Sequence, residues 1–215
     1  MTNFTPIFPL GIVAYPTEVV SLHIFEPRYI QLITECVEQQ KTFALPVVID
    51  GKVQETATMM QVKSIEKKYE GQEMDIRTIG LHTCRILELI KELPDKLYSG
   101  AIVAHNAAPV FSMQNHQVQV IAKMRRLHQL LGVEKNYKKS DEELTSFDIA
   151  HHIGLNLHSE YELLCIENEG QRLTFLQRHM KEALDLLDEQ QKTRDRILLN
   201  GHFRNLSLDN FDFKK

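Results

Sequence analysis

Residues 6–29 read Pro-Ile-Phe-Pro-Leu-Gly-Ile-Val-Ala-Tyr-Pro-Thr-Glu-Val-Val-Ser-Leu-His-Ile-Phe-Glu-Pro-Arg-Tyr, and this stretch decides the fold. Its first prolines cannot donate a backbone hydrogen bond, so they suit the ends or edges of strands. The β-branched pairs Ile12-Val13 and Val19-Val20 are typical of short buried strands. Pro27 fits the first turn of a helix. The stretch therefore predicts a strand, a turn, a second strand and the start of a helix.

The end of this stretch, His-Ile-Phe-Glu-Pro-Arg-Tyr at residues 23–29, resembles the N-terminal substrate-binding domain of Lon proteases, as does Phe-Pro-Leu at residues 8–10. The resemblance is strongest to free-standing bacterial proteins that consist of this domain alone. Later segments also fit, because residues 148–150 open a helix and residues 167–173 precede a long helix where the family has a Glu/Asp-x-x-x-Arg-Leu pattern. The family often has Pro-Gly where this chain has Pro16 and Thr17, which suggests an altered loop.

The resemblance implies both a fold and a function. The implied fold is α+β, with a PUA-like β pseudo-barrel followed by a C-terminal α-helical bundle. The implied function is that of a non-catalytic module that binds an unfolded or a specific polypeptide. Fold alone does not fix function, so this expectation rests on the family resemblance.

Composition is that of an ordinary globular protein. The chain has 215 residues, 43% of them hydrophobic and 25% charged, with a net charge of -4. Both halves are slightly acidic, which argues against a nucleic-acid partner. The three cysteines are far apart, which favours reduced thiols in a cytoplasmic protein. No secretory signal or membrane-spanning stretch is expected.

The periodicity of apolar residues changes along the chain. Up to about Pro109 it is mostly strand-like, with a turn at Asp50-Gly51, a hairpin loop at residues 69–72 and a bend at Gly80. From about residue 112 it is helical. We therefore expect a β-rich unit over residues 1–111, a helical unit over 112–201 and a tail over 202–215, which either packs on the body or docks elsewhere.

Helix ends are also predicted. Gly132 is expected to end the first C-terminal helix, Thr145 or Ser146 to cap a short one, and Ser159 to cap the next. The sequence Asn-Gly at residues 200–201 is expected to stop the last and longest helix.

Catalytic chemistry is not expected. A phosphate-binding loop needs glycines ahead of Gly-Lys-Ser/Thr, and the Gly51-Lys52 pair has neither the glycines nor the hydroxyl residue. No Ser-Lys peptidase domain can be recognised. The adjacent His151 and His152 would leave a helix about 100° apart, so they do not suit one metal ion. We expect no catalytic residue, no cofactor and no metal, and hence no enzyme.

Seven residues remain as candidates for peptide binding or for defining the fold. Four belong to the motif, and for them we expect either large anchors packed on the barrel or one wall of a peptide groove between barrel and bundle: Phe25, Glu26, Arg28 and Tyr29. The other three are methionines near an expected hairpin edge, which either adapt to varied peptides or fill the barrel core: Met59, Met60 and Met74.

Two other functions stay open. PUA-like barrels elsewhere bind RNA, and a cleft between the two units could hold a small molecule. The sequence leaves the oligomeric state undecided.

Overall fold

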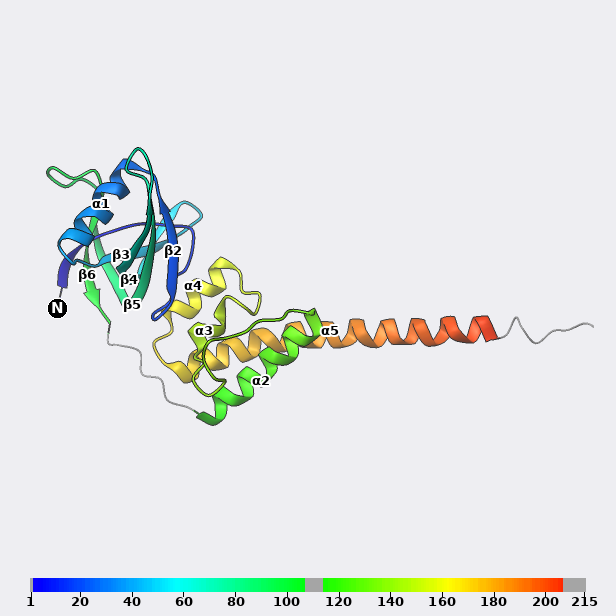
Figure 1. Ribbon diagram of the computed structural model, residues 1–215. Coiled ribbons are helices and arrows are strands. Elements are labelled where there is room, and N and C mark those ends of the chain that lie inside the picture. The colour runs from blue at the N-terminus through cyan, green and yellow to red at the C-terminus, as the bar shows by residue number, and fades with distance from the viewer. Residues whose placement is uncertain (1, 107–113, 207–215) are drawn as a thin grey trace, which may run out of the picture.

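The computed structural model describes residues 2–106 and 114–206. Six antiparallel strands and one helix form a barrel, and four further helices pack at one end of it (Figure 1). The fold class is therefore α+β, as expected. The elements in chain order are β1 (Thr2–Pro6), β2 (Val19–Ile24), α1 (Pro27–Glu38), β3 (Phe43–Ile49), β4 (Lys52–Lys68), β5 (Met74–Ile90), β6 (Gly100–His105), α2 (Gln114–Leu131), α3 (Ser146–Ala150), α4 (Leu157–Cys165) and α5 (Glu169–Leu206).

The sheet closes on itself. Its strand order is β1-β6-β5-β4-β3, and β2 pairs with the first half of β5. The chain that follows β1 then runs beside β3, where Ile7 and Leu10 form parallel bridges with Ala44 and Val47. The amide of Phe8 donates to the carbonyl oxygen of Ala44 at 2.8 Å. The last strand of the order thus meets the continuation of the first, which makes a barrel and leaves few free strand edges.

The expected turns are present, whereas one expected strand is not. Asp50 and Gly51 both have positive φ, +51° and +73°, which suits a tight hairpin between β3 and β4. The strand predicted at Ile12-Val13 is wrong. That segment forms no ladder, because its loop is held by separate contacts, such as the hydroxyl of Thr58 donating to the carbonyl of Ala14 at 2.5 Å.

The missing side chain of Gly80 leaves room for this loop to pack against β5. A side chain at Gly80 would place its Cβ 2.1 Å from the carbonyl oxygen of Tyr15. The amide of Thr17 donates to the carbonyl of Gly80 at 2.8 Å, and Thr17 itself has φ of +69° where the family often has glycine. The predicted bend is present as a register shift opposite Met59 and Met60. The altered loop therefore lies close against β5.

The motif starts α1 as predicted. Pro27 occupies the first turn, and the buried face of α1 carries Tyr29, Leu32, Ile33 and Cys36. The ring of Tyr29 stacks on that of Phe8 at 4.0 Å between centroids. This face covers one side of the sheet and completes a hydrophobic cluster.

Two of the four predicted helix ends are confirmed. Gly132, with φ of +65°, follows α2, and Thr145 caps α3 in a capping box with Asp148. The cap predicted at Ser159 is wrong, because the side chain of Asn156 accepts from the Ser159 amide at 2.9 Å.

The stop predicted at residues 200–201 is also wrong, since α5 continues through Leu206. A glycine inside a helix costs about 1 kcal/mol and does not by itself end it. Beyond the other helices α5 projects alone, and residues 189–198 are all exposed (Figure 1).

Barrel and helices share one hydrophobic core. Val13, Tyr15, Val47 and Ile49 of the barrel belong to the same buried cluster as the inward faces of the C-terminal helices. The β-rich and helical parts are therefore packed together. The expected limits of separate units stay a prediction, because the break at 111 and residues 207–215 of the tail lie outside the described residues. Within the described ranges, no helix has the length and apolar character needed to cross a bilayer.

Candidate functional site

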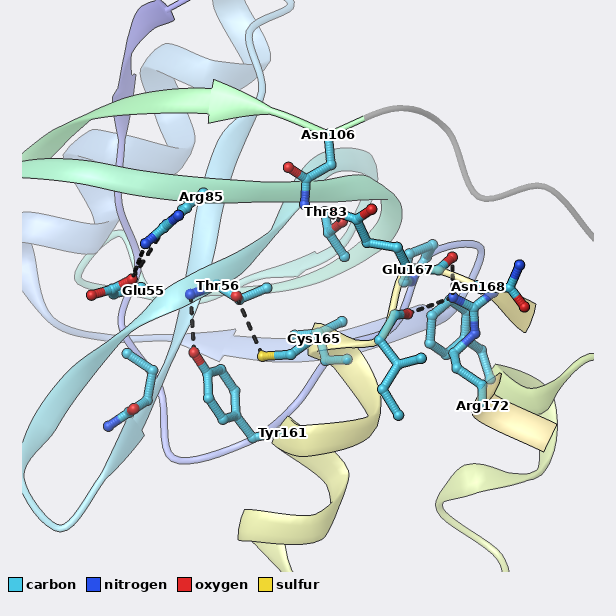
Figure 2. A pocket seen from close by; sticks show the side chains of 15 residues that line it. Glu55, Thr56, Thr83, Arg85, Asn106, Tyr161, Cys165, Glu167, Asn168 and Arg172 are labelled. Carbon is cyan, nitrogen blue, oxygen red and sulfur yellow. Dashed lines mark hydrogen bonds and ion pairs between the residues drawn. The ribbon is translucent and has the colours of Figure 1, made fainter. Parts of the chain in front are cut away.

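A cleft of about 690 Å³ lies between the barrel and the helices (Figure 2). Its barrel side is made of residues of β4 and β5 and of the residue that follows β6: Gln54, Glu55, Thr56, Thr83, Arg85 and Asn106. Its helical side is made of α4 and the link to α5: Tyr161, Leu164, Cys165, Ile166, Glu167 and Asn168. Pro16, Phe147 and Arg172 complete the lining.

The strand residues reach the cleft because side chains alternate along β5. Cys84 and Ile86 point into the barrel core, so Thr83 and Arg85 point outward. Asn106, which directly follows β6, donates from its side-chain nitrogen to the hydroxyl of Thr83 at 3.1 Å. The register of the sheet thus lines this face with hydrogen-bonding groups.

Thr56 joins the two sides of the cleft. Its amide donates to the hydroxyl of Tyr161 at 3.1 Å, and its own hydroxyl accepts from the thiol of Cys165 at 3.4 Å. Burial raises the pKa of Tyr161, which keeps its hydroxyl neutral. These contacts fix the end of α4 against β4.

Arg172 holds the helical wall in place. It is 1% exposed, and its guanidinium donates to the carbonyl oxygens of Ile166 and Glu167 at 2.7 and 2.9 Å. It also pairs with Glu169 at 2.8 Å and lies 4.3 Å above the ring of Phe147. One buried cation therefore shapes the link between α4 and α5 that borders the cleft.

The junction beside the cleft is an ion-pair cluster. The Nδ1 and Nε2 atoms of His151 lie 2.7 Å from Glu160 and 3.3 Å from Glu18. Burial lowers the pKa of His151, but the two carboxylates outweigh it and raise the pKa to about 9. The hydroxyl of the buried Tyr15 donates to the carbonyl of Glu160 at 3.0 Å. The barrel loop is thus tied to α3 and α4.

The charges of the cleft are balanced. Glu55 and Arg85 pair at 3.0 Å on its exposed rim, and Glu167 and the buried Arg172 are the other charged residues of the lining. Among the residues described, no group of three or more His, Cys, Asp or Glu side chains is arranged to hold a metal ion. The arrangement offers hydrogen bonds and apolar contact rather than a charged or metal-binding surface.

The motif does not line this cleft, contrary to the expected groove wall. Phe25 is 59% exposed, so the packed anchor expected there is wrong. Arg28 pairs with Glu26 at 2.7 Å on the surface, and its guanidinium lies 4.5 Å above the ring of Tyr29. Of the four motif candidates, Tyr29 is buried, in the cluster that the inward face of α1 forms with the sheet.

The three candidate methionines fill the core. Met59, Met60 and Met74 are all buried, and they belong to two clusters on opposite faces of the sheet. The alternative in which they adapt to a peptide at an exposed edge is therefore wrong. Both faces of β4 are covered at this point, so neither methionine there can reach solvent.

Sequence reasoning missed every residue of the cleft as a site residue. Thr56, Thr83 and Asn106 are single polar residues at strand positions, and they carry no motif. The spacing of Glu169 and Arg172, three residues apart at a helix start, was the one available signal of a structural ion pair.

Comparison with known proteins supports the resemblance. The sequence profile described as "ATP-dependent protease La (LON) substrate-binding domain" matches residues 5–182. A Lon N-terminal domain protein from Xanthomonas campestris has a similar structure, with a TM-score of 0.64 and 18% identity over 81% of this chain and 96% of its own. The N-terminal domain of Mycobacterium avium complex Lon protease has a TM-score of 0.59 and 9% identity over 83% of this chain and 98% of its own. No curated protein matches the chain.

Proposed function

The chain belongs to the family of Lon substrate-binding domains, and we propose that it binds polypeptide in the cleft between barrel and helices without acting on it chemically. The observation that carries the proposal is this cleft, because the family to which the chain belongs is described as a substrate-binding domain. The bound polypeptide is either an unfolded segment or a specific partner. A cytoplasmic location stays a prediction.

The lining suits an extended chain of varied sequence. The side-chain amides of Gln54, Asn106 and Asn168 carry both donors and acceptors, as the peptide backbone does. Ile166 and Pro16 add apolar surface for side chains. Hydrogen bonds to the backbone give affinity without reading sequence, so we expect weak binding that increases with apolar content.

A small-molecule ligand is the second candidate. The volume of about 690 Å³ falls within the range of about 300–1,000 Å³ common for such sites. RNA is not favoured, because the two glutamates of the lining match its two arginines.

Fluorescence anisotropy tests the proposal directly. An apolar peptide with an amidated C-terminus and an oligonucleotide of similar length are titrated at low and moderate salt. We expect the peptide to bind with little salt dependence, because the charges of the cleft cancel. Steeply salt-dependent binding of the oligonucleotide alone would replace the proposal with RNA binding.

A matched pair of variants locates the binding. Thr83→Trp fills the cleft, whereas Leu87→Trp adds the same ring on the outward face of β5 away from the lining. We expect Thr83→Trp to weaken peptide binding about tenfold or more, which corresponds to about 1.4 kcal/mol, and Leu87→Trp to leave it unchanged. Equal affinities for the two variants would exclude the cleft.

A further inference from the structure

A second, smaller pocket lies beside the motif and shares no residue with the cleft. Its volume is about 160 Å³. Its walls are mostly apolar and include Ile7, Pro9, Tyr29, Val53 and Ile90. We call it the motif pocket, because Arg28 and Tyr29 belong to the motif at the start of α1.

The size of the motif pocket suits one side chain. An apolar cavity of about 150 Å³ holds a benzene molecule, whereas sites for larger ligands begin at about 300 Å³. Two residues of its lining, Ile7 and Tyr29, are buried. A leucine, valine or phenylalanine side chain would fill it.

The rim of the motif pocket is positively charged. The Nε and Nη2 atoms of Arg28 both bond one oxygen of Glu26, at 2.9 and 2.7 Å, which leaves other N–H donors of the guanidinium for a second acceptor. Lys91 is exposed, and its ammonium has no ion-pair partner within residues 2–106 and 114–206. Two cations and one anion at the rim favour a ligand with one negative charge.

The simplest ligand that offers an apolar side chain next to a carboxylate is the C-terminal residue of a polypeptide. In an extended peptide neighbouring side chains point in opposite directions, so an acidic neighbour would point away from the pocket that its apolar neighbour fills. The terminal α-carboxylate is attached to the same Cα as the terminal side chain. Both groups can therefore reach one pocket and its rim.

We propose that the motif pocket binds the C-terminal residue of a polypeptide, with an apolar side chain in the pocket and the α-carboxylate on Arg28 and Lys91. The inference rests on the proposed function, because it assumes that the chain binds polypeptide. It adds a preference for a free, apolar C-terminus and gives the exposed arginine of the motif a role in binding.

The test compares two peptides of one sequence that end in leucine, one as the free acid and one amidated. We expect the free acid to bind about tenfold more tightly, in the range of a charged hydrogen bond. Lys91→Gln should remove most of this preference, and Lys68→Gln, an exposed lysine of β4 outside the pocket, should keep it. Glu26→Gln frees Arg28 and should strengthen binding of the free acid, a gain that a structural role would not produce.

The outcomes separate the two proposals. Equal binding of acid and amide, or a preference that Lys91→Gln and Glu26→Gln leave unchanged, would overturn the motif pocket as a carboxylate site. Binding of the amidated peptide that Thr83→Trp weakens would still support the cleft. If neither peptide binds, the proposed function fails as well.

Discussion

Arg172 is the residue on which the cleft wall depends most. Its guanidinium satisfies two backbone carbonyls of the link between α4 and α5, and it pairs with the buried Glu169. The hydroxyl of Ser146 accepts from its Nε at 2.9 Å. A buried ion pair is not by itself a large gain in stability, but removing one partner leaves the other charge without compensation.

We therefore predict that Arg172→Ala lowers the free energy of unfolding by about 3–5 kcal/mol, measured by urea denaturation. Arg126→Ala is the control, because Arg126 pairs with Asp188 at 2.7 Å on the surface and such pairs contribute about 1 kcal/mol or less. Adding Glu169→Leu to Arg172→Ala should recover part of the loss. Equal losses for Arg172→Ala and Arg126→Ala would contradict this assignment.

Phe25 and Tyr29 belong to one motif but differ in burial, because Phe25 is exposed and Tyr29 is buried. The sequence predicts large anchors packed on the barrel as one role for the motif, and the structure shows no such packed setting at Phe25 or Arg28. We now predict about 1 kcal/mol or less for Phe25→Ala and about 3–5 kcal/mol for Tyr29→Ala. Thermal denaturation measures both, and similar losses would refute the difference in burial.

At the scale of elements, the sequence predicts correctly the turns and helix ends that depend on contacts between neighbouring residues. The turn at Asp50-Gly51, the proline at the start of α1 and the cap at Thr145 were all predictable from a few adjacent residues. The loop at residues 11–18 was not, because it forms hydrogen bonds with β4 and β5, which lie far along the chain. Alternation also could not tell whether Met59 and Met60 face solvent, because both faces of β4 are buried there.

The junction of the barrel loop with α3 and α4 should depend on pH through His151. Its pKa is raised to about 9 in the folded chain, above its ordinary value of about 6.5. The protonated ring then stabilises the fold fully below about pH 6.5, and this contribution declines as the pH rises and is lost through about pH 9. Urea denaturation between pH 6 and pH 10 measures the loss.

His151→Gln provides the control for that measurement, because thiols exposed on unfolding also titrate at alkaline pH. We expect the variant to lack the part of the alkaline decline that His151 causes, and to be less stable than the native chain at pH 6. Identical pH profiles for the two proteins would show that Glu18 and Glu160 do not hold a charged imidazole.

At the scale of the whole molecule, the cleft is formed by segments that are far apart in the sequence and pack together in the fold. The family resemblance predicted the α+β class and substrate binding, and the family match supports both. The cleft could not be predicted, because it combines outward residues of β4 and β5 with a link more than sixty residues later in the chain. No local sequence pattern predicts that these segments lie together. Their position depends on the shared core around Tyr15 and Phe147, whose rings stack with their centroids 4.9 Å apart.

Cys165 offers the most direct measurement of whether the cleft binds polypeptide. It is exposed and lines the cleft, whereas Cys36 and Cys84 are buried, where burial raises their pKa values to about 11 and about 12. Alkylation of the native chain should therefore modify Cys165 first. We predict that an amidated apolar peptide slows this modification, with a concentration dependence that matches its binding curve, and that the protection is lost in Thr83→Trp. An alkylation rate that stays unchanged at saturating peptide would contradict binding in the cleft.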